Sequence, residues 1–334
     1  MTIVVHAPGI QTTVQDLGRS AWQHAGVPVG GAMDEQAHRI ANLLVGNAAT
    51  DPALDCALGG IALQFESDVL LALTGRNITA SIDGVPVPPW RALRARRGGL
   101  LALHNGCRTT IAIAGGIAVP TVLDGRGTCL RGAFGGWYGR ALRRDDRLPI
   151  GAAAPLGERI AAYLDARQRT VSDWIAGPAL RPAYASATRV RMIPGPEQAL
   201  LTAASRDAFF GDIFRIAPES DRMGYRLAGP SLALTSHREM ISSGVSAGTI
   251  QLPPGGAPIV LMADRQTTGG YPRIGDVIAV DLPLLAQLQP GDRVTFASTT
   301  LDEAHALLRQ REHSLARATR AMQLRFANGA DGAR

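Results

Sequence analysis

The chain consists of short apolar segments that are repeatedly interrupted by turn-forming residues. Its 334 residues include 38 glycines and 21 prolines, whereas aromatic residues make up only 5%. The longest apolar runs, around residues 69–73, 111–119 and 258–263, are well below the roughly 18–20 residues that span a bilayer. Short strands joined by turns fit this pattern better than long helices do. We therefore expect a mainly β, globular protein that does not enter a membrane.

The first half of the chain predicts one capped helix and then a series of strands. Asp34 can cap a helix whose apolar face is formed by Ala37, Ile40, Ala41 and Leu44, and Gly46 can end it. Strands are predicted from apolar or alternating runs bounded by Gly, Pro and Asn, at residues 61–65, 69–73, 80–87, 100–104 and 109–116.

Residues 151–187 are rich in alanine and proline, which indicates a domain boundary. The second half predicts further strands at residues 189–196, 214–220, 249–254, 258–264, 277–283 and 293–296, with a short helix at 282–288. Thr300 and Glu303 have the spacing of a capping box and predict the start of a last helix. Scattered arginines after residue 312 predict a frayed basic tail.

The chain has no lysine, so all 34 of its basic residues are arginines. A P-loop needs a lysine, a Schiff base needs an amine, and biotin or lipoate is attached to a lysine. These chemistries are excluded within this chain, and any biotin must be carried by another chain.

Charge and cysteine usage exclude further classes. The net charge is +6, but the arginines are scattered without interleaved aromatics, so neither nucleic-acid binding nor membrane association is expected. Cys56, Cys107 and Cys129 have no C-x-x-C spacing, which argues against a disulfide framework or a zinc site. The N-terminus MTIVVHAPG lacks the features of a signal peptide, and we expect a cytoplasmic protein.

Three local patterns resemble functional motifs. Residues 244–248 match G-x-S-x-G, but the prolines that follow prevent the helix that a nucleophile elbow requires, so we interpret them as a turn. Glu35 and His38 have the spacing of half a carboxylate-bridged metal site, but no second copy exists and no metal site is expected. The glycines of residues 132–139 lack the context of a dinucleotide fingerprint.

Two polar stretches are stronger candidates. Residues 220–230 place Asp221, Arg222, Tyr225 and Arg226 close together, and residues 263–276 follow an apolar strand with a dense polar run. An arginine guanidinium binds two oxygens of a carboxylate or phosphate at once and keeps its positive charge. Threonine hydroxyls and glycine amides can donate further hydrogen bonds to the same anion. The alternative is an internal Asp–Arg ion pair within each loop.

These segments together resemble the biotin-dependent carboxyltransferase family, also known as allophanate hydrolase subunit 2 or as the C subunit of 5-oxoprolinase. The resemblance covers residues 2–310 and is carried by TTVQDLGR, RIANLLVGN, LTG, AIAGGIAVP, RGAFGGWYGR, PGPE, SDRMGYRLAGP, GTIQLPPGG and LMADRQTTGGYP. The chain departs from the family pattern at Asp55, Arg76 and Cys129, where glutamate, alanine and tyrosine are usual.

The resemblance implies a fold of two cyclophilin-like β-barrel subdomains with a few short helices. Residues 1–184 would form a module similar to carboxyltransferase subdomain A, residues 185–312 a module similar to subdomain B, and residues 313–334 the basic C-terminal tail. A partner chain would supply the C and D pieces.

The resemblance also implies a function. The chain would be the C subunit of an ATP-dependent 5-oxoprolinase, which opens 5-oxo-L-proline to L-glutamate. Its partners would be a carboxyltransferase C/D-type subunit, similar to the B subunit of 5-oxoprolinase, and a lactam-hydrolase A subunit. ATP with magnesium would be shared with a partner. Two alternatives remain: the carboxyltransferase component of a biotin-dependent urea or amide carboxylase, and a non-catalytic binder that antagonises a sensor-kinase inhibitor.

Such a reaction needs fixed positive charge, because substrate carboxylate, phosphoryl group and developing oxyanion are all negative. Two sets of residues are predicted to form the site. Catalytic or orienting roles are assigned to Asp16, Asp221, Asp264 and Arg265. Substrate binding is assigned to Arg126, Arg131, Arg222, Tyr225, Arg226, Gln266, Thr267, Thr268, Gly269, Gly270 and Tyr271.

Overall fold

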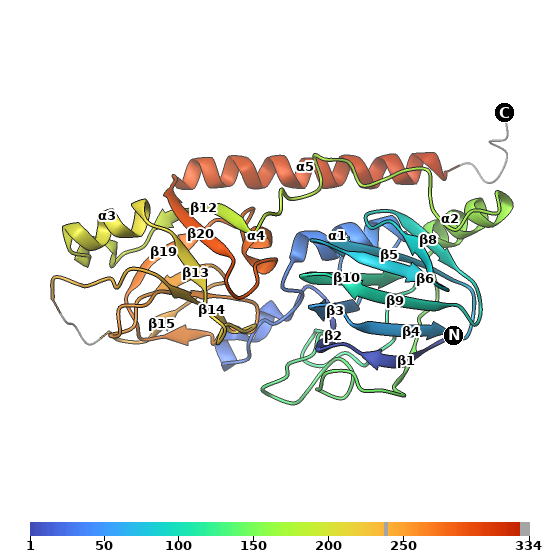
Figure 1. The fold of residues 1–334 in the computed structure, drawn as a ribbon, viewed down its shortest axis with the longest axis horizontal. Coiled ribbons are helices and arrows are strands. Elements are labelled where there is room, and N and C mark those ends of the chain that lie inside the picture. The colour runs from blue at the N-terminus through green and yellow to red at the C-terminus, as the bar shows by residue number, and fades with distance from the viewer. Residues whose placement is uncertain (237–239, 328–334) are drawn as a thin grey trace. The chain divides into compact units, whose positions relative to one another are not determined.

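The computed structural model describes residues 1–236 and 240–327. The chain divides into two compact units (Figure 1). Of the described residues, the first unit contains 1–18, 34–182 and 312–327, and the second contains 19–33 and those of 183–311. The predicted boundary at residue 184 lies beside this division. Residues 19–33 were not expected in the second unit, because they precede the predicted boundary by 150 residues of sequence or more.

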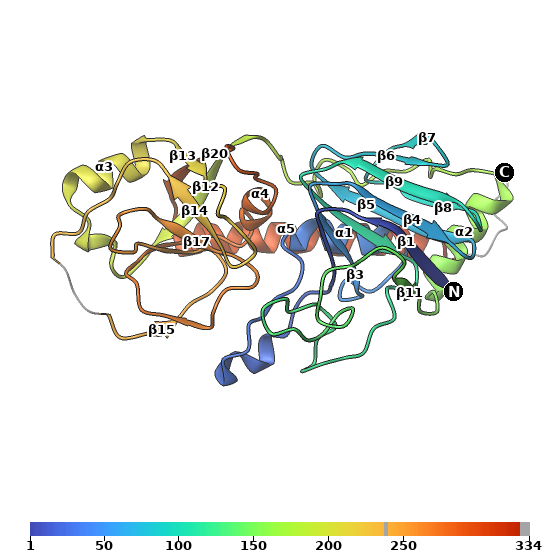
Figure 2. The same ribbon diagram turned by 60° about the horizontal axis from the view of Figure 1, so that its bottom comes forward.

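The first unit is built on two antiparallel sheets. The six-stranded sheet has the order β11-β1-β4-β9-β6-β7 and the five-stranded sheet the order β2-β3-β10-β5-β8. Figure 2 shows the β6–β7 hairpin in profile. The strands are β1 (Thr2–Pro8), β2 (Gln11–Gln15), β3 (Ala53–Ala57), β4 (Ile61–Phe65), β5 (Val69–Gly75), β6 (Thr79–Ile82), β7 (Val85–Val87), β8 (Ala92–Ala95), β9 (Leu100–Asn105), β10 (Arg108–Ile113) and β11 (Arg147–Pro149).

The two sheets of the first unit enclose one apolar core. Alternate residues of β4 (Ile61, Leu63 and Phe65) are buried in it, as the alternation in the sequence predicts. β5 is buried along its whole length, because the other face of its sheet is covered by helix α1 (Glu35–Leu44). A second helix, α2 (Pro155–Ala166), also contacts β5.

The ends of α1 follow the sequence prediction. The Asp34 carboxylate accepts a hydrogen bond of 2.9 Å from the amide of Ala37, which confirms the predicted N-cap. At the other end the Gly46 amide donates to the Leu43 carbonyl with φ at +76°, and a Cβ atom at residue 46 would lie 2.4 Å from the Gly157 nitrogen. The helix therefore ends where only glycine fits.

The second unit is a closed barrel of seven strands in the order β12-β19-β16-β17-β14-β13-β20. All ladders are antiparallel except that between β12 and β20. The barrel strands are β12 (Ala187–Pro194), β13 (Phe214–Ile216), β14 (Gly224–Ala228), β16 (Thr249–Gln251), β17 (Ile259–Leu261), β19 (Arg273–Val277) and β20 (Arg293–Ser298). Outside the barrel, the second unit contains η1 (Ser20–Ala25), η2 (Gln198–Leu200), α3 (Ala203–Gly211), α4 (Leu282–Ala286) and a two-stranded antiparallel sheet of β15 (Ser243–Gly244) and β18 (Thr268–Gly269). The mainly β fold class is confirmed.

One strand of the barrel is displaced from its predicted place. The prediction of a strand at residues 277–283 is wrong, since β19 ends at Val277. The Asp281 carboxylate, which is 2% exposed, accepts hydrogen bonds from the Arg191 backbone amide and guanidinium at 2.6–2.9 Å. Asp281 lies directly before α4, so this ion pair fixes the start of that helix against β12, and residues 278–281 form a turn rather than a strand.

The last helix, α5 (Leu301–Arg325), is long rather than short. Thr300 and Glu303 exchange two hydrogen bonds of 3.2 Å, which confirms the capping box. The prediction of a frayed tail after residue 312 is wrong for the described part. The Arg39 guanidinium donates one hydrogen bond to each oxygen of the Glu312 carboxylate, and Leu315 and Phe326 are buried. Residues 328–334 lie outside the described residues. In the described part of the chain, none of the helices combines the length and apolar character needed to cross a membrane.

Candidate functional site

Two of the predicted residues of the second unit, Arg222 and Asp264, meet where the loop after β17 contacts residues 19–33. The Arg222 guanidinium binds both oxygens of the Asp264 carboxylate at 2.8 Å and donates a third hydrogen bond of 2.6 Å to the Gly31 carbonyl. Arg222 is 5% exposed. The structure therefore assigns Arg222 and Asp264 to an internal ion pair, the alternative considered above, although the pair joins the two polar stretches rather than lying within one.

Gly30 lies against the same pair. Its amide donates to the Ala263 carbonyl at 3.1 Å, and a Cβ atom at residue 30 would lie 3.8 Å from Asp264 Oδ1 and 3.6 Å from Arg19 Nη1. Gly30 has a φ of +67°, which favours glycine. Backbone and side-chain contacts thus hold residues 19–33 on the barrel, which explains why this segment belongs to the second unit.

Arg265 differs from Arg222. Its side chain is buried, with 8% exposure, and within the described residues it contacts no carboxylate: Nη1 donates a long hydrogen bond of 3.4 Å to the Met262 carbonyl, and Nε has no partner. Burial lowers the pKa of Arg265 below its ordinary value. Because a buried charge is costly unless it is paired, this guanidinium is suited to binding an anion.

Three other predicted residues of this region do not join Arg265. Asp221 is an exposed turn residue whose carboxylate accepts from the amides of Met223 and Gly224. Tyr225 points into the barrel core, where its hydroxyl contacts the Ala286 carbonyl at 3.4 Å. Arg226 is exposed on the opposite face of β14, because neighbouring residues of a strand alternate between its faces.

The loop that follows Arg265 borders a polar cleft of about 530 Å³. Thr267 and Thr268 line this cleft. The pairing of β15 with β18 holds them there through the Gly244–Thr268 register, together with a hydrogen bond from the Val245 amide to the Thr267 carbonyl. The half-buried Gln266 and the adjacent Gly269 belong to the same loop but do not line the cleft. Eight further residues line it: Gln23, His24, Gly244, Val245, Ser246, Thr249, Arg273 and Asp276.

These residues were missed as candidates. Thr249 donates a hydrogen bond of 2.6 Å to Asp276, and the Ser246 amide donates to the Thr249 hydroxyl at 3.1 Å. Arg273 donates to the Gly244 carbonyl and lies 3.6 Å from Glu197. The prediction of a turn at residues 244–248 holds only in part: Gly244 ends strand β15, and the turn itself spans residues 246–249, where the Thr249 amide donates to the Ser246 carbonyl. Residues 244–246 also form a wall of the cleft. The sequence does carry a signal for this wall, the G-x-S-x-G pattern of residues 244–248, but that pattern predicted only a turn.

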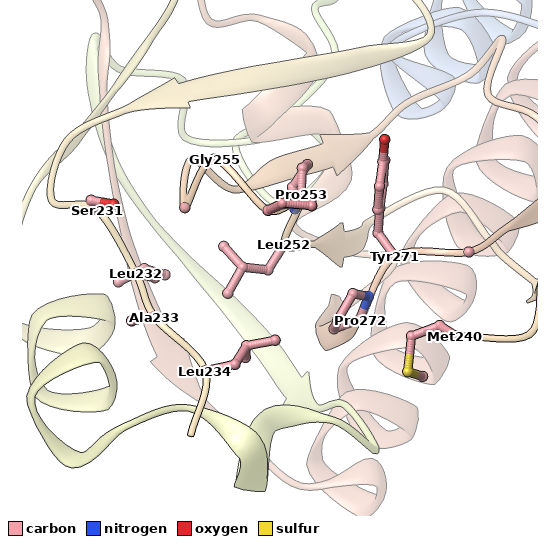
Figure 3. A pocket seen from close by; sticks show the side chains of 13 residues that line it. Ser231, Leu232, Ala233, Leu234, Met240, Leu252, Pro253, Gly255, Tyr271 and Pro272 are labelled. Atoms are coloured by element: carbon pink, nitrogen blue, oxygen red, sulfur yellow. The ribbon is translucent and has the colours of Figure 1, made fainter. Parts of the chain in front are cut away.

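Gly270 and Tyr271 line a different, apolar pocket of about 620 Å³ (Figure 3). In Figure 3, Leu232 and Leu234 lie on one side of the pocket and Tyr271 stands upright on the other, with Leu252 between them. Among the described residues that line this pocket, none is charged. The residues of the predicted loop therefore lie in three different places: Arg265 is buried, Thr267 and Thr268 line the polar cleft, and Gly270 and Tyr271 line the apolar pocket.

The three predicted residues of the first unit are best described by themselves. The Asp16 carboxylate accepts from the backbone amides of Gly18 (2.8 Å) and Arg126 (2.6 Å), and it is 6% exposed. The Arg126 guanidinium contacts Asp51 at 3.3 Å. Arg131 is exposed. Asp16 thus fastens the loop of residues 124–128 onto the end of β2, which is the contact expected of a structural residue.

The first unit also contains a buried histidine. His38 of α1 is 1% exposed, and its Nε2 lies 3.1 Å from the Asn42 amide nitrogen. Burial lowers the pKa of His38 to about 4, despite the opposing effect of Asp16 and Asp55. His38 is therefore a neutral, hydrogen-bonded histidine of the core. In the part of the chain that the structure describes, no three His, Cys, Asp or Glu side chains gather in a way that could hold a metal ion.

Comparison with known proteins places this geometry in a family. The family model described as "Carboxyltransferase domain, subdomain A and B" matches residues 25–298. The chain belongs to this family. The resemblance inferred from the sequence is confirmed.

Relatives in the family cover nearly the whole chain. It is 41% identical over 300 residues to the 5-oxoprolinase C subunit of Escherichia coli, covering 89% of this chain and 91% of that protein. It is 35% identical over 305 residues to the 5-oxoprolinase C subunit of Haemophilus influenzae, covering 90% and 93%. The crystal structure of K. lactis urea amidolyase superposes with a TM-score of 0.85 at 26% identity, covering 95% of this chain and 20% of that one. The chain thus matches about a fifth of that larger enzyme.

Proposed function

We propose that this protein is the C subunit of an ATP-dependent 5-oxoprolinase, which opens 5-oxo-L-proline to L-glutamate together with partner subunits. The bacterial relatives of this name support the proposal across nearly their full length. The partners are a carboxyltransferase C/D-type subunit, similar to the B subunit of 5-oxoprolinase, and a lactam-hydrolase A subunit. The complex works in the cytoplasm.

The observation that carries the proposal is the buried guanidinium of Arg265, which contacts no carboxylate among the described residues. 5-Oxoproline is an anion at neutral pH because of its carboxylate. A planar guanidinium binds a carboxylate through two parallel hydrogen bonds, and it does so more strongly away from water. Arg265 lies two residues before Thr267, so a substrate held by its carboxylate would be near the loop whose hydroxyl groups line the cleft.

The described residues of this chain do not by themselves fit a magnesium–nucleotide complex. The chain has no lysine for a P-loop, and no cluster of metal ligands occurs among the described residues. We assign the nucleotide contacts to partner subunits and derive no step through them. Asp264, Asp221 and Asp16 are engaged in internal hydrogen bonds, so we assign them positioning roles rather than proton transfer.

The proposal is tested with the reconstituted complex of the three subunits, by measuring glutamate formation from 5-oxoproline. We expect Arg265→Leu to lower kcat/KM by about 10²–10⁴-fold, because each lost charge-assisted hydrogen bond is worth about 1.5–3 kcal/mol. The same variant should retain or gain thermal stability, because it removes a buried charge that no carboxylate of the described residues compensates. Arg226→Leu, which changes an exposed arginine of the same barrel, is the control and should remain active. Normal turnover by Arg265→Leu would contradict the assignment of the anion site.

The structural similarity to urea amidolyase favours one second candidate, the carboxyltransferase component of a biotin-dependent urea or amide carboxylase. In that reaction Arg265 would bind the carboxylate carried by biotin on another chain. The two functions are distinguished by supplying the complex with 5-oxoproline and ATP, or with urea, ATP, bicarbonate and a biotinylated carrier. Glutamate formed without biotin supports the first function, and urea-dependent consumption of bicarbonate supports the second.

A further inference from the structure

Residues 19–31 form a loop whose base is fastened to the barrel. The Arg19 amide donates to the Val29 carbonyl at 2.8 Å, which closes the loop on itself. At the same end, Gly30 donates to the Ala263 carbonyl and the Gly31 carbonyl accepts from Arg222 at 2.6 Å. The ion pair of Arg222 with Asp264 holds that arginine in place. The base of the loop is therefore rigid.

The tip of this loop forms one wall of the polar cleft. It is the 3₁₀-helix η1, in which no residue is buried. Two successive side chains of η1, Gln23 and His24, nevertheless line the cleft, and a glycine in the left-handed region, Gly26 with φ at +78°, ends the helix. An exposed helix held at its base and turned toward a polar cleft is suited to presenting a side chain to a ligand.

The hydrogen bond at the ring of His24 determines which nitrogen carries the proton. Nδ1 of His24 lies 2.9 Å from the carbonyl oxygen of Ala21. A carbonyl oxygen can only accept a hydrogen bond, so Nδ1 is the donor, and in the neutral ring the lone pair is on Nε2. The ring is further oriented by stacking on Trp22, with centroids 6.2 Å apart and planes 21° apart. Nε2 has no hydrogen-bond partner within the described residues.

We propose that His24 is the general base of this chain and removes a proton from the water molecule that opens the lactam. This inference rests on the proposed function. The water oxygen forms a bond to the lactam carbonyl carbon as its proton moves to Nε2. The ring C–N bond then breaks, its electron pair stays on nitrogen, and the proton on Nε2 is returned to that nitrogen. These steps convert one lactam and one water to one amino acid, so their atoms and charge balance, and the nucleoside triphosphate is consumed at the partner subunits to which its contacts are assigned above.

The other walls of the cleft fit this role. Asp276, the other group in the cleft able to accept a proton, is already bound by the Thr249 hydroxyl at 2.6 Å. Arg273 and the hydroxyls of Thr267 and Thr268 add donors for the oxygen that gains negative charge at the carbonyl carbon. Arg222 and Asp264 then act as positioning residues, because they fasten the loop that carries His24.

The test compares the wild-type and variant chains in the reconstituted complex, supplied with 5-oxoproline and a nucleoside triphosphate. Loss of a general base costs about 10²–10⁴-fold in rate. We expect His24→Ala to lower kcat by at least about 10²-fold with little change in KM, and added imidazole to restore part of the rate. His6→Ala, which changes an exposed histidine hydrogen-bonded to Gln64, should have wild-type kinetics.

Different outcomes separate this inference from the proposed function. Absence of 5-oxoproline hydrolysis by the wild-type complex would overturn the proposed function. An active wild-type complex with a fully active His24→Ala variant would overturn the role of His24 alone. A His24→Ala defect confined to KM, without rescue by imidazole, would show that His24 binds substrate and would also overturn its role as base.

Discussion

The strongest prediction about stability concerns the end of the last helix, where Phe326 is held between two aromatic rings of the first unit. Phe326 is 5% exposed and packs edge-on against Tyr163 and Trp174, at centroid distances of 5.5 and 5.4 Å. The neighbouring Arg325 lies over the Trp174 ring and forms an ion pair with Asp173 at 3.0 Å. The Phe326 carbonyl accepts from Arg159 at 3.0 Å. We predict that Phe326→Ala destabilises the first unit.

The expected magnitude follows from these contacts. Truncation of a buried phenylalanine costs about 3–5 kcal/mol, of which two edge-to-face pairs contribute about 1–3 kcal/mol. Because Phe326 follows the last residue of α5, its backbone can shift into the space, and we expect the lower value, about 3 kcal/mol. At about 2–4 °C per kcal/mol, the melting transition of the first unit should shift down by about 6–12 °C.

The assay is differential scanning calorimetry of the full chain, in which the variant is compared with Leu324→Ala. Leu324 is in the same helix turn and is 59% exposed, so its truncation should change the free energy of unfolding by less than about 0.5 kcal/mol. If Phe326→Ala melts with the Leu324→Ala control, the helix end does not stabilise the fold and the reasoning is refuted.

Three further predictions concern single groups. Asp264→Asn leaves the buried Arg222 without its counter-charge and should lower the free energy of unfolding of the second unit by about 3–5 kcal/mol in urea titrations, while the exposed Asp221→Asn has little effect; equal midpoints would contradict the ion pair's role. Burial lowers the pKa of His38 to about 4, so below pH 6.5 the unfolded chain takes up a proton that the folded protein excludes until about pH 4. As pH falls across this interval, up to about 3 kcal/mol of the free energy of unfolding is lost. The free energy of unfolding of His38→Gln should therefore depend less steeply on pH, and parallel curves for variant and wild type would contradict the prediction. Gly46→Ala should lower the melting temperature far more than Gly84→Ala, because both have positive φ but only at residue 46 would a Cβ atom meet the backbone, 2.4 Å from the Gly157 nitrogen; similar shifts would show that α2 yields at this contact.

Local features of the fold could be predicted wherever neighbouring residues decide them. The caps at Asp34 and Thr300 were predicted because a helix end is satisfied by side chains within three residues of it. The alternation of Ile61, Leu63 and Phe65 predicted a half-buried strand for the same reason. The prediction failed at residues 277–283 and after residue 312, because distant groups, Arg191 in one case and Arg39 in the other, decide where the chain turns or continues.

The candidate site shows the same division. The polar stretches around Arg222 and Asp264 were found because arginine and aspartate in loops after apolar strands are an unusual local composition. Which arginine can bind a substrate anion depends on the tertiary structure. Arg222 is neutralised by Asp264, Arg226 is exposed to solvent, and Arg265 is buried without a carboxylate partner among the described residues. His24 could not be connected with Thr267 from the sequence, since more than two hundred residues separate them and only the packing of residues 19–33 against the barrel brings them to one cleft.

The amino-acid sequence by itself determined the mainly β class, the family and the exclusion of lysine chemistry, because these depend on composition, local periodicity and motif order. The tertiary structure alone decided which charges are paired, which are buried alone, and which loop reaches the cleft. The physical reason is that the energy of a charge depends on its distance from other charges and from water, and those distances are set only when remote segments pack together.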